Sequence, residues 1–157
     1  EQGKEGMRRI HFFILLLSLS ACLPAPTVEP TSAVPAPYRI TAEENPYAPK
    51  PEDLSLQIAD VTITSVNLSE RFEFTPPRVL VNFLGYMPGV CNELRINVKP
   101  PDENYRVFIE VYSLTDSDTV CEGVFKQFEA SIMLGTYSSG RYTIWVNDEP
   151  AGDFSAY

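Results

Sequence analysis

The sequence predicts an all-β protein, an antiparallel β-sandwich of seven or eight strands over residues 54–157. Short runs of alternating apolar and polar residues recur through this region, and a period of two is typical of half-buried strands. Turn-forming residues separate these runs, and no window combines helical periodicity with capping residues. A small barrel is the alternative arrangement of such short strands.

The expected strands follow one another at short intervals. They are centred on residues 56–58, 61–68, 79–84, 94–98, 105–111, 128–132, 142–146 and 153–157. The second run changes register once, because Val61 and Ile63 belong to one parity while Val66 and Leu68 belong to the other. Residues 79–84 are almost uninterruptedly apolar, which predicts a central strand. The turns fall at residues 76–77, 88–89, 100–102, 116–118, 139–140 and 147–150.

Residues 1–21 have the organisation of a secretory signal, and Met7 is the expected start of translation. Arg8-Arg9 precede an apolar run of about a dozen residues, which is shorter than the roughly 20 needed to span a membrane. Small residues stand directly before Cys22. This arrangement resembles the lipobox of bacterial lipoproteins, which implies that Cys22 is lipidated and becomes the first mature residue. The alternative is a plain secretory signal that is cut nearby.

Residues 22–53 are predicted to form a disordered, Pro-rich stalk that carries the lipidated cysteine. Eight of the fourteen prolines lie between Pro24 and Pro51, so this segment has little apolar surface to bury. Tyr38, Ile40 and Tyr47 are more apolar than a linker requires, and we expect them to contact the domain or a partner. The lipoprotein resemblance places the domain on the extracytoplasmic face of a cell membrane or outer membrane.

The charge of the chain argues against a nucleic-acid partner. Residues 22–157 contain nine basic and nineteen acidic residues, a formal charge of −10, which repels phosphate backbones and anionic lipids alike. Membrane attachment would therefore depend on the acyl chains of Cys22.

The three cysteines divide into one lipidation site and one pair. If Cys22 is acylated, Cys91 and Cys121 remain, and outside the cytoplasm they are expected to form a disulfide. Closing that loop would contribute about 3–4 kcal/mol on the chain-entropy model. A metal site is the alternative, but two isolated cysteines without a nearby histidine argue against it.

A late strand carries a structural resemblance to a known fold. Gly140-Arg141-Tyr142 resembles the glycine-x-tyrosine start of a strand in immunoglobulin-like and fibronectin-like domains, which implies that Tyr142 packs at a corner and bonds the backbone. More broadly, residues 54–157 resemble uncharacterised immunoglobulin-like domains of bacterial envelope lipoproteins. The residues that carry this likeness are Cys91, Cys121, Phe125 or Phe128, Gly140, Tyr142 and Asn147. The likeness carries no catalytic residues.

Aromatic side chains are the candidate binding residues: Trp145, Tyr112, Tyr105 and Tyr137. Trp145 alternates with Tyr142, Ile144 and Val146, so it should face away from them, on the outer face or at a sheet edge. An exposed aromatic group would suit a glycan or a protein partner. The alternative is that a loop or the stalk covers Trp145.

The residues available for catalysis are few, and we predict that the protein is not an enzyme. His11, the only histidine, lies in the signal, so no histidine relay, metal site or cofactor is expected in the domain. Asp102 with Glu103, or the acids of residues 116–122, could serve a carboxylate-based glycan hydrolase, but solvated turns explain them more simply. The acids of residues 116–122 also lack the spacing of a calcium loop.

The sequence therefore favours a lipid-anchored binding or interaction module of the cell envelope. A protease inhibitor or envelope assembly factor that presents residues 87–92 is the second reading. In either case the partner would be an envelope protein or a glycan.

Overall fold

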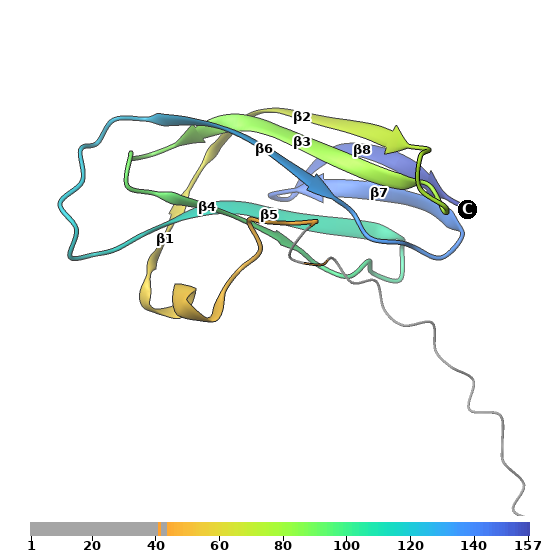
Figure 1. The fold of residues 1–157 in the computed structure, drawn as a ribbon, viewed down its shortest axis with the longest axis horizontal. Coiled ribbons are helices and arrows are strands. Elements are labelled where there is room, and N and C mark those ends of the chain that lie inside the picture. Colours follow the sequence, from red (N-terminus) through yellow and green to blue (C-terminus); the bar gives the residue numbers. More distant parts are fainter. Residues whose placement is uncertain (1–40, 42–43) are drawn as a thin grey trace, which may run out of the picture. The chain divides into compact units, whose positions relative to one another are not determined.

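The computed structural model describes residue 41 and residues 44–157, and the predicted signal, Cys22 and most of the stalk lie outside these residues. The first element of the described residues is the short 3₁₀ helix η1 (Pro51–Ser55), and eight strands follow it (Figure 1). They are β1 (Gln57–Asp60), β2 (Thr62–Arg71), β3 (Arg78–Met87), β4 (Glu93–Val98), β5 (Arg106–Thr115), β6 (Lys126–Met133), β7 (Gly140–Val146) and β8 (Glu149–Ala156). The all-β prediction is confirmed, with eight strands.

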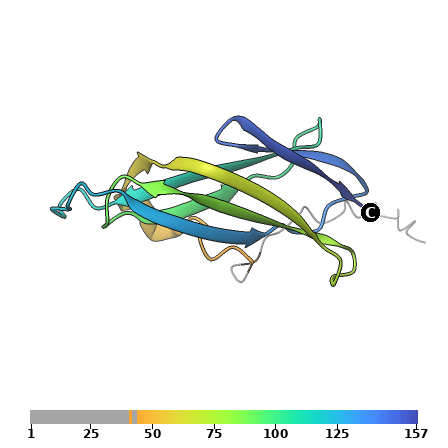
Figure 2. The same cartoon turned by 90° about the horizontal axis from the view of Figure 1, so that it is seen from above.

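The strands form two sheets, which appear as separate layers in Figure 1, whereas Figure 2 looks down on the sandwich with β2, β3 and β6 in front. One sheet has the order β2-β3-β6, so the apolar run in β3 is central, as predicted. In the other sheet β5 pairs with β1, β4 and β7, and β7 pairs with β8. The described strands thus make a β-sandwich.

One pair of strands departs from the expected antiparallel arrangement, because β5 and β7 are parallel. Parallel neighbours need a crossover between them. Here β6 supplies it: the chain leaves β5, runs through β6 in the opposite sheet, and returns as β7. The alternation of apolar residues cannot reveal this, since a strand with one buried face alternates in the same way whether its neighbour is parallel or antiparallel.

The core lies between the two sheets and follows the period of two. In β5, the buried residues Val107, Ile109 and Val111 alternate with half-buried Phe108 and Glu110. Strands β3, β6 and β7 bury alternate residues in the same way. The predicted register change in β2 is also present, as a bulge between Ile63 and Ser65.

The proline content predicts that residues 44–53 belong to the disordered stalk, but in the structure they pack on the sandwich. The backbone of residues 44–47, the strap, bonds both sheets: the Glu44 carbonyl accepts from Met133 N–H at 2.9 Å, and the Tyr47 carbonyl accepts from Ile96 N–H at 2.8 Å. Asn45 is buried and its amide donates to the Ile96 carbonyl at 2.8 Å. Because Met133 ends β6 and Ile96 lies in β4, the strap covers the exposed edges of both strands.

The 3₁₀ helix η1 is held by a buried ion pair. Asp53 Oδ2 accepts from Arg95 Nε at 2.7 Å and Asp53 Oδ1 accepts from Arg95 Nη2 at 2.8 Å, a bidentate contact. The Arg95 hydrogen bonds hold the pKa of Asp53 down at about 2. Tyr47 packs against the core, as its apolar character suggested, whereas Tyr38 and Ile40 lie outside the described residues.

Candidate functional site

The two bridged cysteines bring together the β3–β4 turn and the long β5–β6 loop at one end of the sandwich (Figure 1). Cys91 and Cys121 form the predicted disulfide, with their Cα atoms 5.9 Å apart. The Cys91 N–H also donates to Cys121 Sγ at 3.0 Å. The disulfide therefore fixes the relative position of two connections that are thirty residues apart.

A buried polar chain, formed by the hydrogen-bonded side chains of Asn92 and Ser113, anchors the β3–β4 turn to the strands beneath it. Asn92 Nδ2 donates to Ser113 Oγ at 3.0 Å, and the Ser113 hydroxyl donates to the Ala59 carbonyl at 3.0 Å. Asn92 is 7% exposed and Ser113 is fully buried, so these bonds are shielded from water. These bonds are not evident from the sequence, because Asn92 and Ser113 are 21 residues apart in the chain.

Apolar side chains project from this anchored base. Val120 is fully exposed, Phe125 is 70% exposed, and Val124 and Val90 are 56% and 43% exposed. Val90 and Val120 each directly precede a bridged cysteine, so they lie close together. These four residues, with Cys91 and Cys121, form the disulfide end. An exposed apolar group of this kind is typical of an interaction surface.

The turn proposed for protease inhibition is short and mostly buried. Met87, Gly89 and Asn92 are buried, and the Asn92 N–H bonds the Gly89 carbonyl at 3.3 Å. Only Val90 and Cys91 are presented to solvent at its tip. The longer β5–β6 loop contributes most of the exposed apolar surface.

The four candidate aromatic residues are divided between two regions of the domain. Tyr105 and Tyr137 contact Tyr142, with ring centroids 5.2 and 4.9 Å away, in an aromatic cluster near the start of β7. The aromatic cluster adjoins the first residues of β5 and β7. The disulfide end follows the last residue of β5, so the two lie at opposite ends of the sandwich. Tyr137 also contacts Phe154 at 5.2 Å, so packing accounts for much of its surface, whereas Tyr105 is half exposed.

Tyr142 occupies the corner that its motif predicts. Its side chain is 3% exposed and its hydroxyl donates to the Ser138 carbonyl at 3.0 Å, so the predicted bond to the backbone is confirmed. Burial raises the pKa of Tyr142. Tyr142 is therefore a structural residue.

Trp145 and Tyr112 lie on the outer face of the five-stranded sheet, facing away from the core. Trp145 is half-buried beside Phe108, with ring centroids 6.3 Å apart, and its indole N–H bonds Thr143 Oγ1 at 3.3 Å. Tyr112 is four residues from Phe108 along β5, a separation of about 13 Å, and Glu110 stands between them. The two candidates therefore do not form a continuous aromatic platform.

The asparagine that ends β7 has a structural part that the sequence did not reveal. Asn147 Oδ1 accepts from the Val111 N–H at 2.7 Å, and Asn147 Nδ2 donates to the Val111 carbonyl at 2.9 Å. Val111 falls between the β5 residues that pair with β7 and those that pair with β1. At Val111 the Asn147 side chain therefore makes the backbone hydrogen bonds that a neighbouring strand would otherwise make.

The carboxylates considered for catalysis are engaged in turns. Asp102 accepts from Arg106 Nε at 2.7 Å and from the backbone N–H groups of Asn104 and Arg106, and the Arg106 contact lowers the pKa of Asp102. Asp116 likewise accepts from the Asp118 N–H at 3.0 Å. Among residues 41 and 44–157, no cluster of histidine, cysteine and acidic side chains has the arrangement of a metal site.

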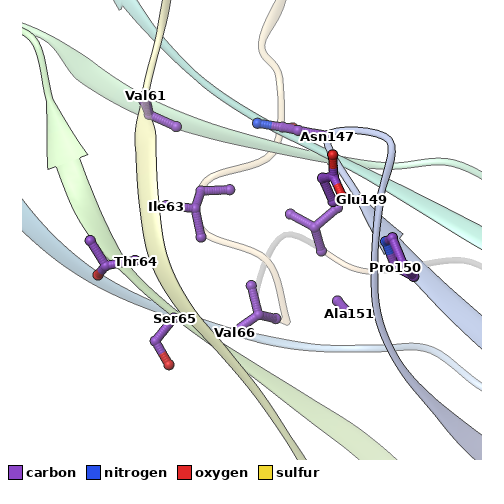
Figure 3. Close-up of a pocket in the computed structure, with 10 residues that line it drawn as sticks. Val61, Ile63, Thr64, Ser65, Val66, Asn147, Glu149, Pro150 and Ala151 are labelled. Atoms are coloured by element: carbon purple, nitrogen blue, oxygen red, sulfur yellow. The ribbon is translucent and has the colours of Figure 1, made fainter.

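A groove opens on the side of the sandwich where β2 faces the β7–β8 hairpin (Figure 3). It has a volume of about 470 Å³, which falls within the range of ligand sites. Apolar residues predominate in its lining: Val61, Ile63, Val66, Val146, Pro150 and Ala151, with Thr64, Ser65, Asn147 and Glu149. The sequence did not reveal this groove, because β2 and β8 are distant in the chain.

The comparison with known families agrees with this architecture. Residues 81–156 match the model of the ORF11 beta-sandwich domain. The match begins in β3 and ends in β8, so the strap, β1 and β2 precede it. No curated protein and no solved structure matches the chain. In the part of the chain that the structure describes, no helix has the length and hydrophobicity to cross a membrane.

Proposed function

We propose that this protein is a non-catalytic interaction module of the cell envelope, anchored through acylated Cys22, that contacts a protein partner through its disulfide end. One observation carries the proposal: four apolar side chains project from two loops that a disulfide joins, and a buried polar chain anchors the β3–β4 turn, which is one of the two. A pre-ordered surface loses little conformational entropy on binding. Phe125 is its largest exposed group and the natural anchor.

The chemistry of the loop indicates what the partner would look like. Asp116, Asp118 and Glu122 are exposed in the same loop as Val120 and Val124. A partner with an apolar hollow and a basic rim would complement both features. Complete burial of an apolar side chain of this size contributes about 1.5–3 kcal/mol, so the four side chains together would offset much of the free energy that association costs.

The assignment as a non-enzyme rests on the placement of the acidic groups. A general acid needs a pKa raised toward neutrality, whereas Arg106 lowers the pKa of Asp102. Asp116 is committed to a turn. The described domain also contains no histidine.

Matched substitutions at opposite ends of the sandwich test the binding surface. Phe125 and Phe72 are 70% and 69% exposed, but Phe72 follows β2 at the end away from the disulfide. Protein crosslinked in native envelopes should capture a defined partner, F125S should lose it, and F72S should retain it. Equal capture by F125S and wild type would contradict the proposal.

The anchor is tested separately. Mass spectrometry of the mature N-terminus should find acylated Cys22, and Cys22→Ser should release the protein from the membrane fraction. An unmodified cysteine on a protein that stays soluble would refute the lipid anchor without affecting the binding surface.

A further inference from the structure

We propose that the groove between β2 and β8 binds an extended peptide segment of a partner, in which apolar residues alternate and one end is basic. This site is separate from the disulfide end and does not depend on the function proposed for it. The peptide would lie along the edge of β2 and fill the space between the sheets (Figure 3). Strand addition of this kind joins backbone bonds with pockets for alternate side chains.

The groove is a wedge. At its closed end β2 and β8 are in contact, because the Leu68 side chain packs directly on Gly152. A Cβ added to this glycine would lie only 3.1 Å from Leu68 Cδ1. From there the strands diverge toward Val61 and Glu149, which line the open part. The interval from Val61 to Val66 is about 17 Å long, which matches an extended segment of about six residues.

The floor of the wedge is apolar and only partly covered. Val61, Ile63, Val66 and Ala151 pack against the core yet remain half-buried, while Val146 beneath them is buried. Figure 3 shows Ile63 and Val66 pointing across the groove toward the hairpin that carries Pro150 and Ala151. Apolar side chains of a bound segment would complete the burial of this floor.

The backbone edges beside the groove are available for pairing. Among the described strands, β2 pairs only with β3, and β8 pairs only with β7. Pro150 has no N–H to donate and the β7–β8 register shifts beside it, so β8 is a poor pairing edge and β2 is the edge for an added strand. On the other side of the sandwich the strap already covers the edges of β4 and β6.

The charge at the open end selects a basic partner. Glu149 lines the groove and is exposed, and Asp148 precedes it. Asp60 is also exposed, and it pairs with Tyr112 in β5. The neighbouring Val111 bonds Asn147, so Asp60 lies at the same end of the groove as Asp148 and Glu149. None of these three acids belongs to an ion pair in the described part of the chain. A second copy would bring like charges together, because the mature chain carries a charge of −10.

Fluorescence anisotropy with two labelled hexapeptides tests the site in the purified full-length protein. The probes are Lys-Val-Thr-Val-Thr-Val and its reverse, because the added strand could run in either direction. At least one should bind saturably, and binding should weaken about threefold or more when glutamate replaces lysine. Two N-methylated versions of the bound peptide, one methylated at the valines and the other at the threonines, test the backbone bonds. One of them should lose binding, because the N–H groups of alternate residues point to the same side of a strand and only one set can donate to the β2 edge.

Charge reversal on the protein provides the decisive comparison. Glu149→Lys should weaken the lysine peptide about threefold or more and make the glutamate peptide the tighter ligand. The matched control, E129K, changes an exposed residue of β6 away from the groove and should leave both affinities unchanged. In amide NMR spectra, the bound peptide should shift residues 61–66 and 149–151.

The inference would be overturned by no binding of either peptide, by full binding of both N-methylated peptides, or by equal effects of E149K and E129K. Concentration-dependent dimerisation that blocks the peptides would assign the groove to a second copy and also overturn it. F125S should leave peptide binding intact, so failure here and failure at the disulfide end are distinguishable.

Discussion

Replacing Asn147 with alanine should lower the free energy of unfolding by about 3–5 kcal/mol. The substitution removes both hydrogen bonds to the backbone of Val111, at 2.7 and 2.9 Å. Val111 is 2% exposed, so water cannot readily replace these bonds, and each loss costs about 1–2 kcal/mol. Asn147 also has a φ of 47°, and alanine in this left-handed region adds about 1 kcal/mol.

Two further variants separate the side-chain bonds from the backbone conformation. Asp148 has a φ of 67°, so Asp148→Ala should cost only the conformational part, about 1 kcal/mol. Asn147→Gly adopts the same φ without strain and should be less destabilising than Asn147→Ala. The expected order of stability is therefore wild type, D148A, N147G and N147A.

Urea unfolding with the disulfide intact measures these differences. Trp145 is the only tryptophan and lies two residues from Asn147, so its fluorescence reports the transition directly. Equal m-values would show that the variants differ in stability and not in the compactness of the unfolded state. The reasoning would be refuted if N147A and D148A agreed within about 0.5 kcal/mol, since the bonds to Val111 would then contribute nothing.

Two other predictions concern packing and pH. Gly85→Ala should destabilise by about 1–3 kcal/mol or more in urea, because its Cβ would lie 2.3 Å from the Thr62 carbonyl oxygen, whereas Gly123→Ala, with nothing within 4 Å, should be neutral. Comparable losses for both variants would contradict this account. The Arg95 contact lowers the pKa of Asp53 from 3.8 to about 2, so its stabilisation is present above about pH 4 and is lost as the pH falls toward 2. The stability gap between wild type and Asp53→Asn should therefore shrink over that range, and a constant gap would count against the ion pair.

The strand pattern was predictable because it depends on local alternation. The inward residues of β5, β6 and β7 are the ones that the period of two selects, and the bulge in β2 falls where the apolar parity changes. The corner bond of Tyr142 was predictable too, since it reaches only four residues back to Ser138. Such features need no knowledge of which strands are neighbours.

The structural role of residues 44–53 was not predictable from composition. A high proline content is compatible with a stalk and equally with a segment that lies across strand edges, because the strap bonds through backbone carbonyls and one asparagine. The partner of Asn45 is Ile96, 51 residues away. Composition cannot distinguish a polar residue in water from one that is buried against a distant strand.

The candidate site was predictable in part. The pairing of Cys91 with Cys121 followed from the cysteine count, but the exposure of Val120 and Phe125 depends on the paths of two loops. Isolated apolar residues in a loop look the same in the sequence whether they are buried or exposed. The aromatic residues selected as binding candidates proved to be spread over the aromatic cluster and the outer sheet face.

The sequence by itself determined the all-β class, the eight short strands, their inward residues and the cysteine pair, because alternation and residue counts are properties of the chain alone. Only the tertiary structure decided that β5 and β7 are parallel, that the strap closes one side, and that a groove remains between β2 and β8 on the other. These features arise from contacts between segments 36 or more residues apart, such as Asn147 with Val111. Local propensity does not encode them, since each depends on which strand edges meet when two sheets pack.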